Sequence, residues 1–194
     1  MSDKVTPHDL PLQIGEDLFV VYGSIQTNAL LRITRNMTIV RHAGELTLIN
    51  SVRMDEAGLA QLEQLGEIRH VLRLGPLHGK DDAFYVERYG AQMWALPDGI
   101  TYTEPPIDHV LVEAGELPFA NAQLFVFKHM IEPEGVLLLK QSPGVLLTVD
   151  AIQSYAAPPH MPHTNWLARR LLPLRGFVNK TIIGPIWMEI MVTD

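Results

Sequence analysis

The stretch GELTLINSVRMDEAGLAQLEQLGEIRHVLRLGPLHGKDD, residues 44–82, decides the fold. It begins at a predicted hairpin, because strands 36–42 and 45–50 flank Ala43-Gly44, a dipeptide that suits a tight turn. A helix is predicted over 55–65, where Asp55 can cap the free N–H groups of the first turn. The strand 68–74 then leads into a loop that contains His78. This order of strands, helix and polar loop is typical of an α/β protein.

The flanking sequence extends this pattern in both directions. Further helices are predicted from Asp81 or Asp82 to Tyr89, and from Thr164 or Asn165 to Leu174. Further strands are predicted at 17–25, 92–96, 107–112, 123–128, 135–140, 144–149 and, in a tail broken by Gly184-Pro185, within 181–192. Two groups of strands with helices between and after them favour two sheets sandwiched by helices. A doubly wound parallel sheet is the alternative, and the hairpins at Ala43-Gly44 and Pro143-Gly144 argue against it.

Composition limits the class of protein. The 194 residues are 47% hydrophobic and 19% charged, which predicts one globular domain over 1–194 with a flexible N-terminus at about 1–12. The net charge of -7 argues against nucleic-acid binding. No stretch is long and apolar enough to span a bilayer, so we expect a cytoplasmic protein and no membrane partner.

The sequence lacks cysteine and several catalytic and nucleotide-binding motifs, and these absences limit the reactions that the protein could catalyse. The chain has no cysteine, so thiol catalysis is excluded and any metal must be bound by His, Asp or Glu. It has no phosphate-binding GxxxxGK[ST] loop, no GxGxxG and no Gly-x-Ser-x-Gly.

Three predicted strand ends carry side chains that can bind a metal. His78, Asp81 and Asp82 follow strand 68–74, His129 follows 123–128, and Asp150 follows 144–149. Ligands gather at the carboxyl ends of strands in open α/β folds, and these side chains suit zinc, iron or manganese.

Each of these residues also has a structural interpretation. Asp81 at a helix start is expected to act as a cap, and for His78 and Asp82 both roles stay open. His129 alternates with Phe125 and Phe127, so it is either a ligand or a core histidine.

Other polar residues near these strand ends are assigned to loops. Glu132 and Glu134 are interpreted as solvated loop residues. His160 and His163 lie in a proline-rich loop that could fold over the site as a lid.

The order of these elements resembles the metallo-β-lactamase-like superfamily over residues 15–155. The resemblance rests on the hairpin 37–50, the helix from Asp55, the strand leading to His78-Gly79-Lys80-Asp81-Asp82, and the end Leu146-Leu147-Thr148-Val149-Asp150. More narrowly, the sequence is similar to a family of uncharacterised bacterial and plant proteins with a His-containing loop and a late LLxxD strand end. The resemblance implies a four-layer αββα sandwich.

The superfamily's metal-ligand pattern is only partly present. That pattern is a HxHxDH loop, a later His, an Asp after a strand and a final His. Here Pro76 stands two places before His78, His129 is an unaligned third ligand, Asp150 matches the bridging Asp, and no His follows His163.

The resemblance implies a metal-dependent hydrolase with a reduced site, acting on a small molecule or ester. One divalent ion would be held by three or four of His78, Asp82, His129 and Asp150, while Asp81 orients a metal-bound water or acts as base. The alternatives are a non-catalytic member of the fold that binds a small ligand or a partner protein, and an oligomeric structural module, which exposed apolar surface around Trp94, Trp166 or Trp187 would favour. The apolar tail 182–192 could pair across a subunit interface.

Overall fold

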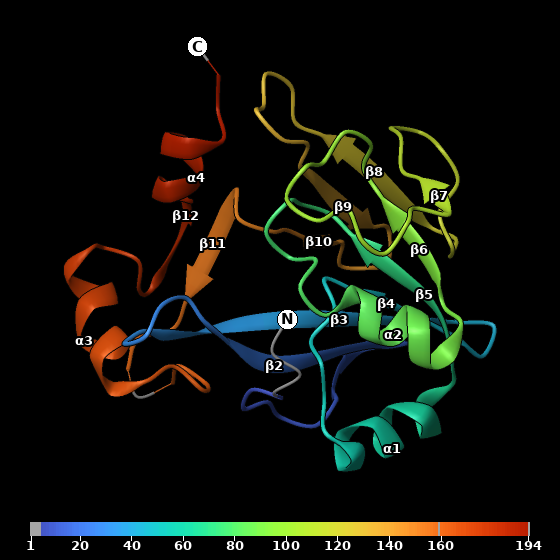
Figure 1. The fold of residues 1–194 in the computed structure, drawn as a ribbon, viewed down its shortest axis with the longest axis horizontal. Coiled ribbons are helices and arrows are strands. Elements are labelled where there is room, and N and C mark those ends of the chain that lie inside the picture. Colours follow the sequence, from blue (N-terminus) through green and yellow to red (C-terminus); the bar gives the residue numbers. More distant parts are fainter. Residues whose placement is uncertain (1–4, 159, 194) are drawn as a thin grey trace.

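The computed structural model describes residues 5–158 and 160–193, which form two facing sheets with helices around them (Figure 1). The larger sheet has seven strands in chain order: β1 (Leu12–Gly15), β2 (Leu18–Gln26), β3 (Arg32–His42), β4 (Glu45–Ile49), β5 (Glu67–Arg73), β6 (Gln92–Ala95) and β7 (His109–Val110). The strands from β1 to β4 pair antiparallel, and those from β4 to β7 pair parallel. The parallel strands β4, β5 and β6 direct their carboxyl ends to one edge, where ligands usually bind.

The predicted hairpin between β3 and β4 is confirmed. Ala43 and Gly44 both have positive φ angles, 51° and 85°, which a two-residue turn of the primed type requires. Such a turn matches the right-handed twist of the flanking strands.

Two helices cover one face of the larger sheet. Helix α1 (Glu56–Leu65) is capped by Asp55, whose side chain accepts a hydrogen bond from the Gly58 N–H, as predicted. Helix α2 (Asp82–Tyr89) ends at Gly90 in the left-handed conformation. Buried side chains of both helices pack against the sheet, among them Leu59, Leu62 and Tyr85.

The opposite face of this sheet packs against the smaller sheet. Its strands lie in the order β10 (Val145–Leu147), β9 (Gly135–Leu139), β8 (Ala122–Val126), all antiparallel. Leu72 and Leu74 from the larger sheet meet Leu124 and Leu137 in a common core between the two sheets.

The chain ends in a two-stranded sheet and two short helices. Strand β11 (Ile152–Tyr155) pairs with β12 (Lys180–Ile183), α3 (Trp166–Leu174) is capped by Asn165, and α4 (Pro185–Ile190) follows. In Figure 1 these elements lie together at the side of the molecule opposite β7.

One prediction for the tail is wrong, because the segment after Gly184-Pro185 is a helix rather than the end of a strand. Pro185 occupies the first turn, where its missing N–H costs nothing. Trp187 and Met191, four residues apart, pack against Phe127 and Met130, and this tertiary contact favours the helical spacing.

Hydrogen bonds join residues 7–9 of the N-terminal stretch, which was predicted to be flexible, to β2 and to the start of α1. Asp9 donates its N–H to the Tyr22 carbonyl, Ser24 Oγ donates to the Pro7 carbonyl, and the Asp55 N–H donates to His8 Nε2. Strand β1, which the sequence did not predict, then adds an edge to the larger sheet.

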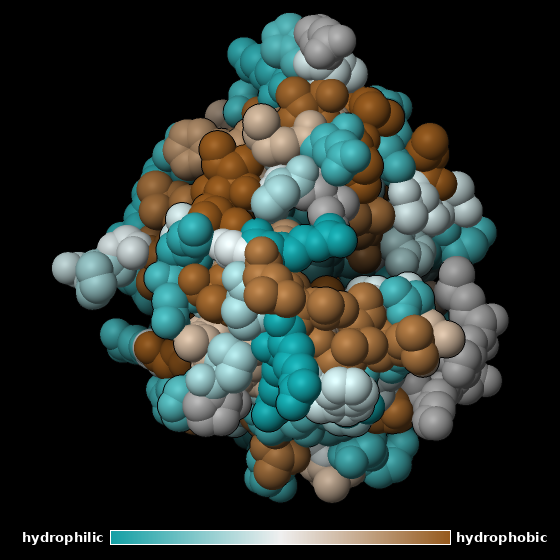
Figure 2. Space-filling view, turned by 90° about the vertical axis from the view of Figure 1, so that its left-hand side faces the viewer, coloured by the Kyte–Doolittle hydropathy of each residue, from teal (hydrophilic) through white to brown (hydrophobic). Residues whose placement is uncertain are grey.

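Apolar side chains are exposed on the face that carries α3, β12 and α4. Figure 2 looks onto this side and shows apolar residues gathered in its upper and lower parts. The most exposed of them include Leu174, Trp166, Ile183 and Met188. In the described part of the chain, no helix has both the length and the apolar character needed to cross a membrane.

Candidate functional site

A cleft of about 1030 Å³ opens where the loops after β5 and β10 meet the ends of β2 and β3. The loop after β5 contributes Leu77 and His78, and the loop after β10 contributes Asp150. Strand β11 and the loop that contains His160 line the rest of the wall. This volume is typical of a small-molecule site.

His78 and Asp150 face each other at the wall of this cleft. His78 Nε2 lies 3.2 Å from Asp150 Oδ2, at ion-pair distance but without hydrogen-bond angles. Asp150 Oδ2 and His78 Nδ1 are both buried with no hydrogen-bond partner among the described residues. The sequence predicted that the strand ends would converge, and these two residues do.

Asp82 lies in the core rather than at the cleft surface. It is fully buried, and its Oδ1 accepts a 2.7 Å hydrogen bond from Ser51 Oγ. Its Oδ2 lies 3.4 Å from Arg73 Nη1. Burial raises the pKa of Asp82 to about 6, against the opposing effects of Ser51, Arg73 and Arg35. Asp82 is therefore held by contacts within the protein, with the Arg73 guanidinium beside its carboxylate.

Asp81 stands at the cap position of α2 but makes no side-chain capping hydrogen bond, so that prediction is wrong. Its Oδ2 instead accepts hydrogen bonds from the Arg53 N–H at 3.0 Å and from Arg35 Nη1 at 3.2 Å. The cationic side chain of Arg35, itself buried, is a stronger attraction than the helix N-terminus.

His129 is exposed and belongs to neither the core nor the cleft wall described above. The backbone of His129 has a positive φ of 59°. Its carbonyl accepts hydrogen bonds from the N–H and Oγ1 of Thr193. The interpretation of His129 as a core histidine is therefore wrong, and its hydrogen bonds with Thr193 join it to the C-terminal segment.

Glu134 is the main residue that sequence reasoning missed. It was interpreted as a solvated loop residue, yet its side chain is fully buried. Oε1 accepts a 2.7 Å hydrogen bond from the Ala151 N–H, while Oε2 has no hydrogen-bond partner among the described residues. Burial, together with the nearby charge of Asp150, raises the pKa of Glu134 to about 7, and the hydrogen bond from Ala151 opposes the shift. No local pattern marks this position, because the groups that bury Glu134 are distant in sequence.

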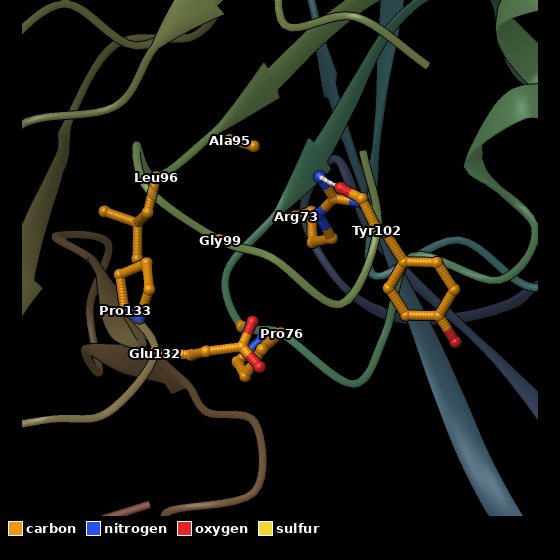
Figure 3. Close-up of a pocket in the computed structure, with 9 residues that line it drawn as sticks. Arg73, Pro76, Ala95, Leu96, Gly99, Tyr102, Glu132 and Pro133 are labelled. Carbon is orange, nitrogen blue, oxygen red and sulfur yellow. Dashed lines mark hydrogen bonds between the residues drawn. The ribbon is translucent and has the colours of Figure 1, made fainter. Parts of the chain in front are cut away.

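Glu132 also has a defined role. Its carboxylate accepts hydrogen bonds from the N–H groups of Ile100 and Thr101 and from Thr101 Oγ1, which fixes the loop after β6. Figure 3 shows Glu132 directed into a small pocket that Arg73 and Tyr102 also line. Its volume of about 20 Å³ suits one water molecule rather than an organic ligand.

The two histidines of the proline-rich loop have different positions. His160 lines the cleft, as a residue of a covering loop would. His163 pairs with Asp9, with 2.9 Å between Nε2 and Oδ1, and does not line the cleft.

The donor set does not fit the metal centre that the resemblance implies. The residues described hold no group of three or more His, Asp or Glu side chains placed to bind an ion. His78 and Asp150 come together, whereas Asp81 and Asp82 are bound by Arg35 and Arg73. A catalytic zinc site usually has three protein ligands.

Comparison with solved structures identifies the type of fold. No family model matches the chain, and no curated protein matches its sequence. Among solved structures, it is similar to the metallo-β-lactamase FIM-1 from Pseudomonas aeruginosa in the mono-zinc form, with a TM-score of 0.61, 14% identity and coverage of 96% of this chain and 94% of that one. It is also similar to the DIM-1 metallo-β-lactamase, with a TM-score of 0.60, 11% identity and coverage of 91% and 93%.

A third structure, a metallo-β-lactamase from Erythrobacter litoralis, gives a TM-score of 0.56 and 12% identity, covering 90% of this chain and 84% of that one. At such identities the likeness concerns the fold and not the activity. The fold predicted from the sequence is confirmed: this chain has the α/β sandwich of the metallo-β-lactamase type.

Proposed function

We propose that this protein binds a small organic molecule in the cleft, with His78 and Asp150 as its polar anchor, and that it does so without a resident metal centre. The observation that carries the proposal is the pairing of these two residues at the wall of a cleft of about 1030 Å³. Large clefts with a few convergent polar groups are the usual location of ligand sites.

The charges around the cleft support a site without metal. In the metal-centre pattern, the acidic residues at the start of α2 would be ligands. Here Arg35 and Arg73 already neutralise Asp81 and Asp82 within the protein. Moving either carboxylate to a metal would leave a buried guanidinium without its partner, which costs several kcal/mol, about 3–5 for a broken buried pair.

The His78–Asp150 pair suits proton exchange with a ligand. An imidazole beside a carboxylate can donate or accept a proton, and it serves as acid or base in many hydrolases. His78 Nδ1 and Asp150 Oδ2 are also buried with no hydrogen-bond partner in the described part of the chain, which is costly unless a bound group satisfies them. We therefore expect ligands that carry both a donor and an acceptor.

The test is a fragment screen by ligand-observed NMR, followed by assays of the hits and of activated esters, lactones and phosphodiesters. His78→Gln and Asp150→Asn should weaken fragment binding by tenfold or more. The control is His163→Gln, since His163 forms a similar pair with Asp9 away from the cleft. Fragments that bind all three variants like the parent would contradict the proposal.

A metal-dependent hydrolase remains the second candidate, because His78 and Asp150 are both ligand types and His160 lines the same cleft. It requires His160 to approach the pair as a third ligand. This candidate predicts a stoichiometric metal that is lost in His78→Ala and Asp150→Ala, whereas the first candidate predicts none.

A further inference from the structure

We propose that Glu134 is a positioning residue that sets Asp150 against His78. Glu134 precedes β9 and contributes no atom to the cleft wall. It acts through the loops that carry the two cleft residues. The inference deepens the proposed function, because it concerns the same pair of side chains.

The first contact holds the Asp150 loop. Glu134 Oε1 accepts the Ala151 N–H at 2.7 Å, one residue after Asp150. Strand β10 ends at Leu147 and β11 begins at Ile152, so no strand pairing fixes residues 148–151 directly. A buried hydrogen bond at this short distance restrains such a loop, because opening it would leave a donor and an acceptor unpaired inside the protein.

The second contact holds the His78 loop. A Cβ atom added to Gly75, three residues before His78, would lie 3.2 Å from Glu134 Oε2 and 3.3 Å from its Cγ. The carboxylate therefore packs directly against the backbone of this loop, and glycine leaves the space that it occupies. The Gly135 N–H donates to the Leu74 carbonyl at 2.8 Å, so the backbone beside Glu134 is also joined to the end of β5.

The third contact comes from the C-terminal helix. The Gly184 N–H, directly before α4, donates to the Ala151 carbonyl at 2.9 Å, so the start of this helix is joined to the residue that Glu134 holds. Trp187 is buried and packs in the cluster that includes Ala151. Glu134 thus lies where the loops after β5 and β10 and the start of α4 meet, and its removal should let the two cleft loops move relative to each other.

The test compares Glu134→Leu with Glu134→Gln in the full-length protein without ligand. Two readouts are followed by NMR at one pH: the ring nitrogen resonances of His78, and hydrogen exchange of the Ala151 amide. Glu134→Leu should shift the His78 resonances and speed Ala151 exchange by about tenfold, the scale of one lost buried hydrogen bond. Glu134→Gln keeps an acceptor oxygen and should restore slow Ala151 exchange.

The control for general destabilisation is Leu59→Ala, in the core on the other side of the larger sheet. It should lower the melting temperature without shifting the His78 resonances. If Glu134→Leu does not fold, Glu134→Ala replaces it, because it removes the same carboxyl group, and Glu134→Gln remains its matched comparison. The proposal is overturned if His78 and Ala151 keep their parent signals in the folded variant, or if Leu59→Ala shifts them equally.

These measurements need no ligand. A failed fragment screen would therefore count against the proposed function and leave the positioning role to be decided by the NMR result alone.

Discussion

Arg73 Nη1 lies 3.4 Å from Asp82 Oδ2, and the two side chains are only 8% and 0% exposed. A guanidinium thus balances a carboxylate at the start of α2, in the segment where the resemblance predicted a metal ligand. Ser51 Oγ donates to the other carboxylate oxygen at 2.7 Å. The charge of Asp82 is accommodated inside the protein.

This relationship predicts a strongly non-additive pair of substitutions. Arg73→Met leaves Asp82 buried without a cation and should lower the free energy of unfolding by about 3–5 kcal/mol. The double variant Arg73→Met/Asp82→Leu removes both charges and should recover at least half of that loss. Urea denaturation of the single and double variants measures the coupling. Additive losses would show that the two side chains do not depend on each other.

The raised pKa of Glu134 predicts that the stability of the fold depends on pH. Its pKa is raised from 4.5 to about 7, so the folded state holds a proton that the unfolded chain releases. Stability should therefore fall as pH rises from about 4.5 to about 7, by up to about 3 kcal/mol. Glu134→Gln cannot ionise, so the parent-minus-variant difference in unfolding free energy should decline across this window. A difference that is flat from pH 4.5 to 8 would be inconsistent with the burial of this carboxylate.

The close packing around Gly184 leaves no room for a larger residue at the start of α4. A Cβ atom there would lie 2.2 Å from the backbone oxygen of Asp150, so Gly184→Ala must move either the helix or the Asp150 loop. We expect a loss of about 1–3 kcal/mol, the usual cost of overpacking. Gly99→Ala is the matched control, because nothing lies within 4 Å of its added methyl group. Equal stability of the two variants, measured by chemical denaturation, would rule out the close approach.

The cap of α1 predicts a smaller effect. Asp55 Oδ1 accepts the Gly58 N–H at 2.9 Å, so Asp55→Ala should cost about 1 kcal/mol. Asp55→Ser retains a capping oxygen and should lose much less. Thermal unfolding of the two variants separates loss of the cap from loss of a surface charge, and equal losses would point to the charge.

Local signals explain which features the sequence predicted. The turn at Ala43-Gly44, the cap at Asp55 and the helix stop at Gly90 each depend on a few adjacent residues. His78 follows β5 of the larger sheet and Asp150 follows β10 of the smaller sheet, and the rule that functional side chains gather beyond strand ends placed both near one site.

The remaining features depend on contacts between distant segments. Glu134 is fully buried and accepts a hydrogen bond from Ala151, and the Asp81 side chain binds Arg35 instead of capping α2. Helix α4 forms where its apolar residues meet Phe127 and Met130. None of these partners lies near enough in the chain to leave a periodic or motif signal.

We expect the cleft to hold no resident metal ion, because Arg35 and Arg73 balance Asp81 and Asp82 at the start of α2 and leave His78 and Asp150 as the pair at the cleft wall. Elemental analysis of untagged protein, purified from cells supplied with zinc, iron and manganese, tests it most directly. The account predicts no stoichiometric metal and no tight binding on titration with zinc. One or two metals per chain in the parent protein, lost in His78→Ala and Asp150→Ala, would contradict it and favour the metal-dependent hydrolase.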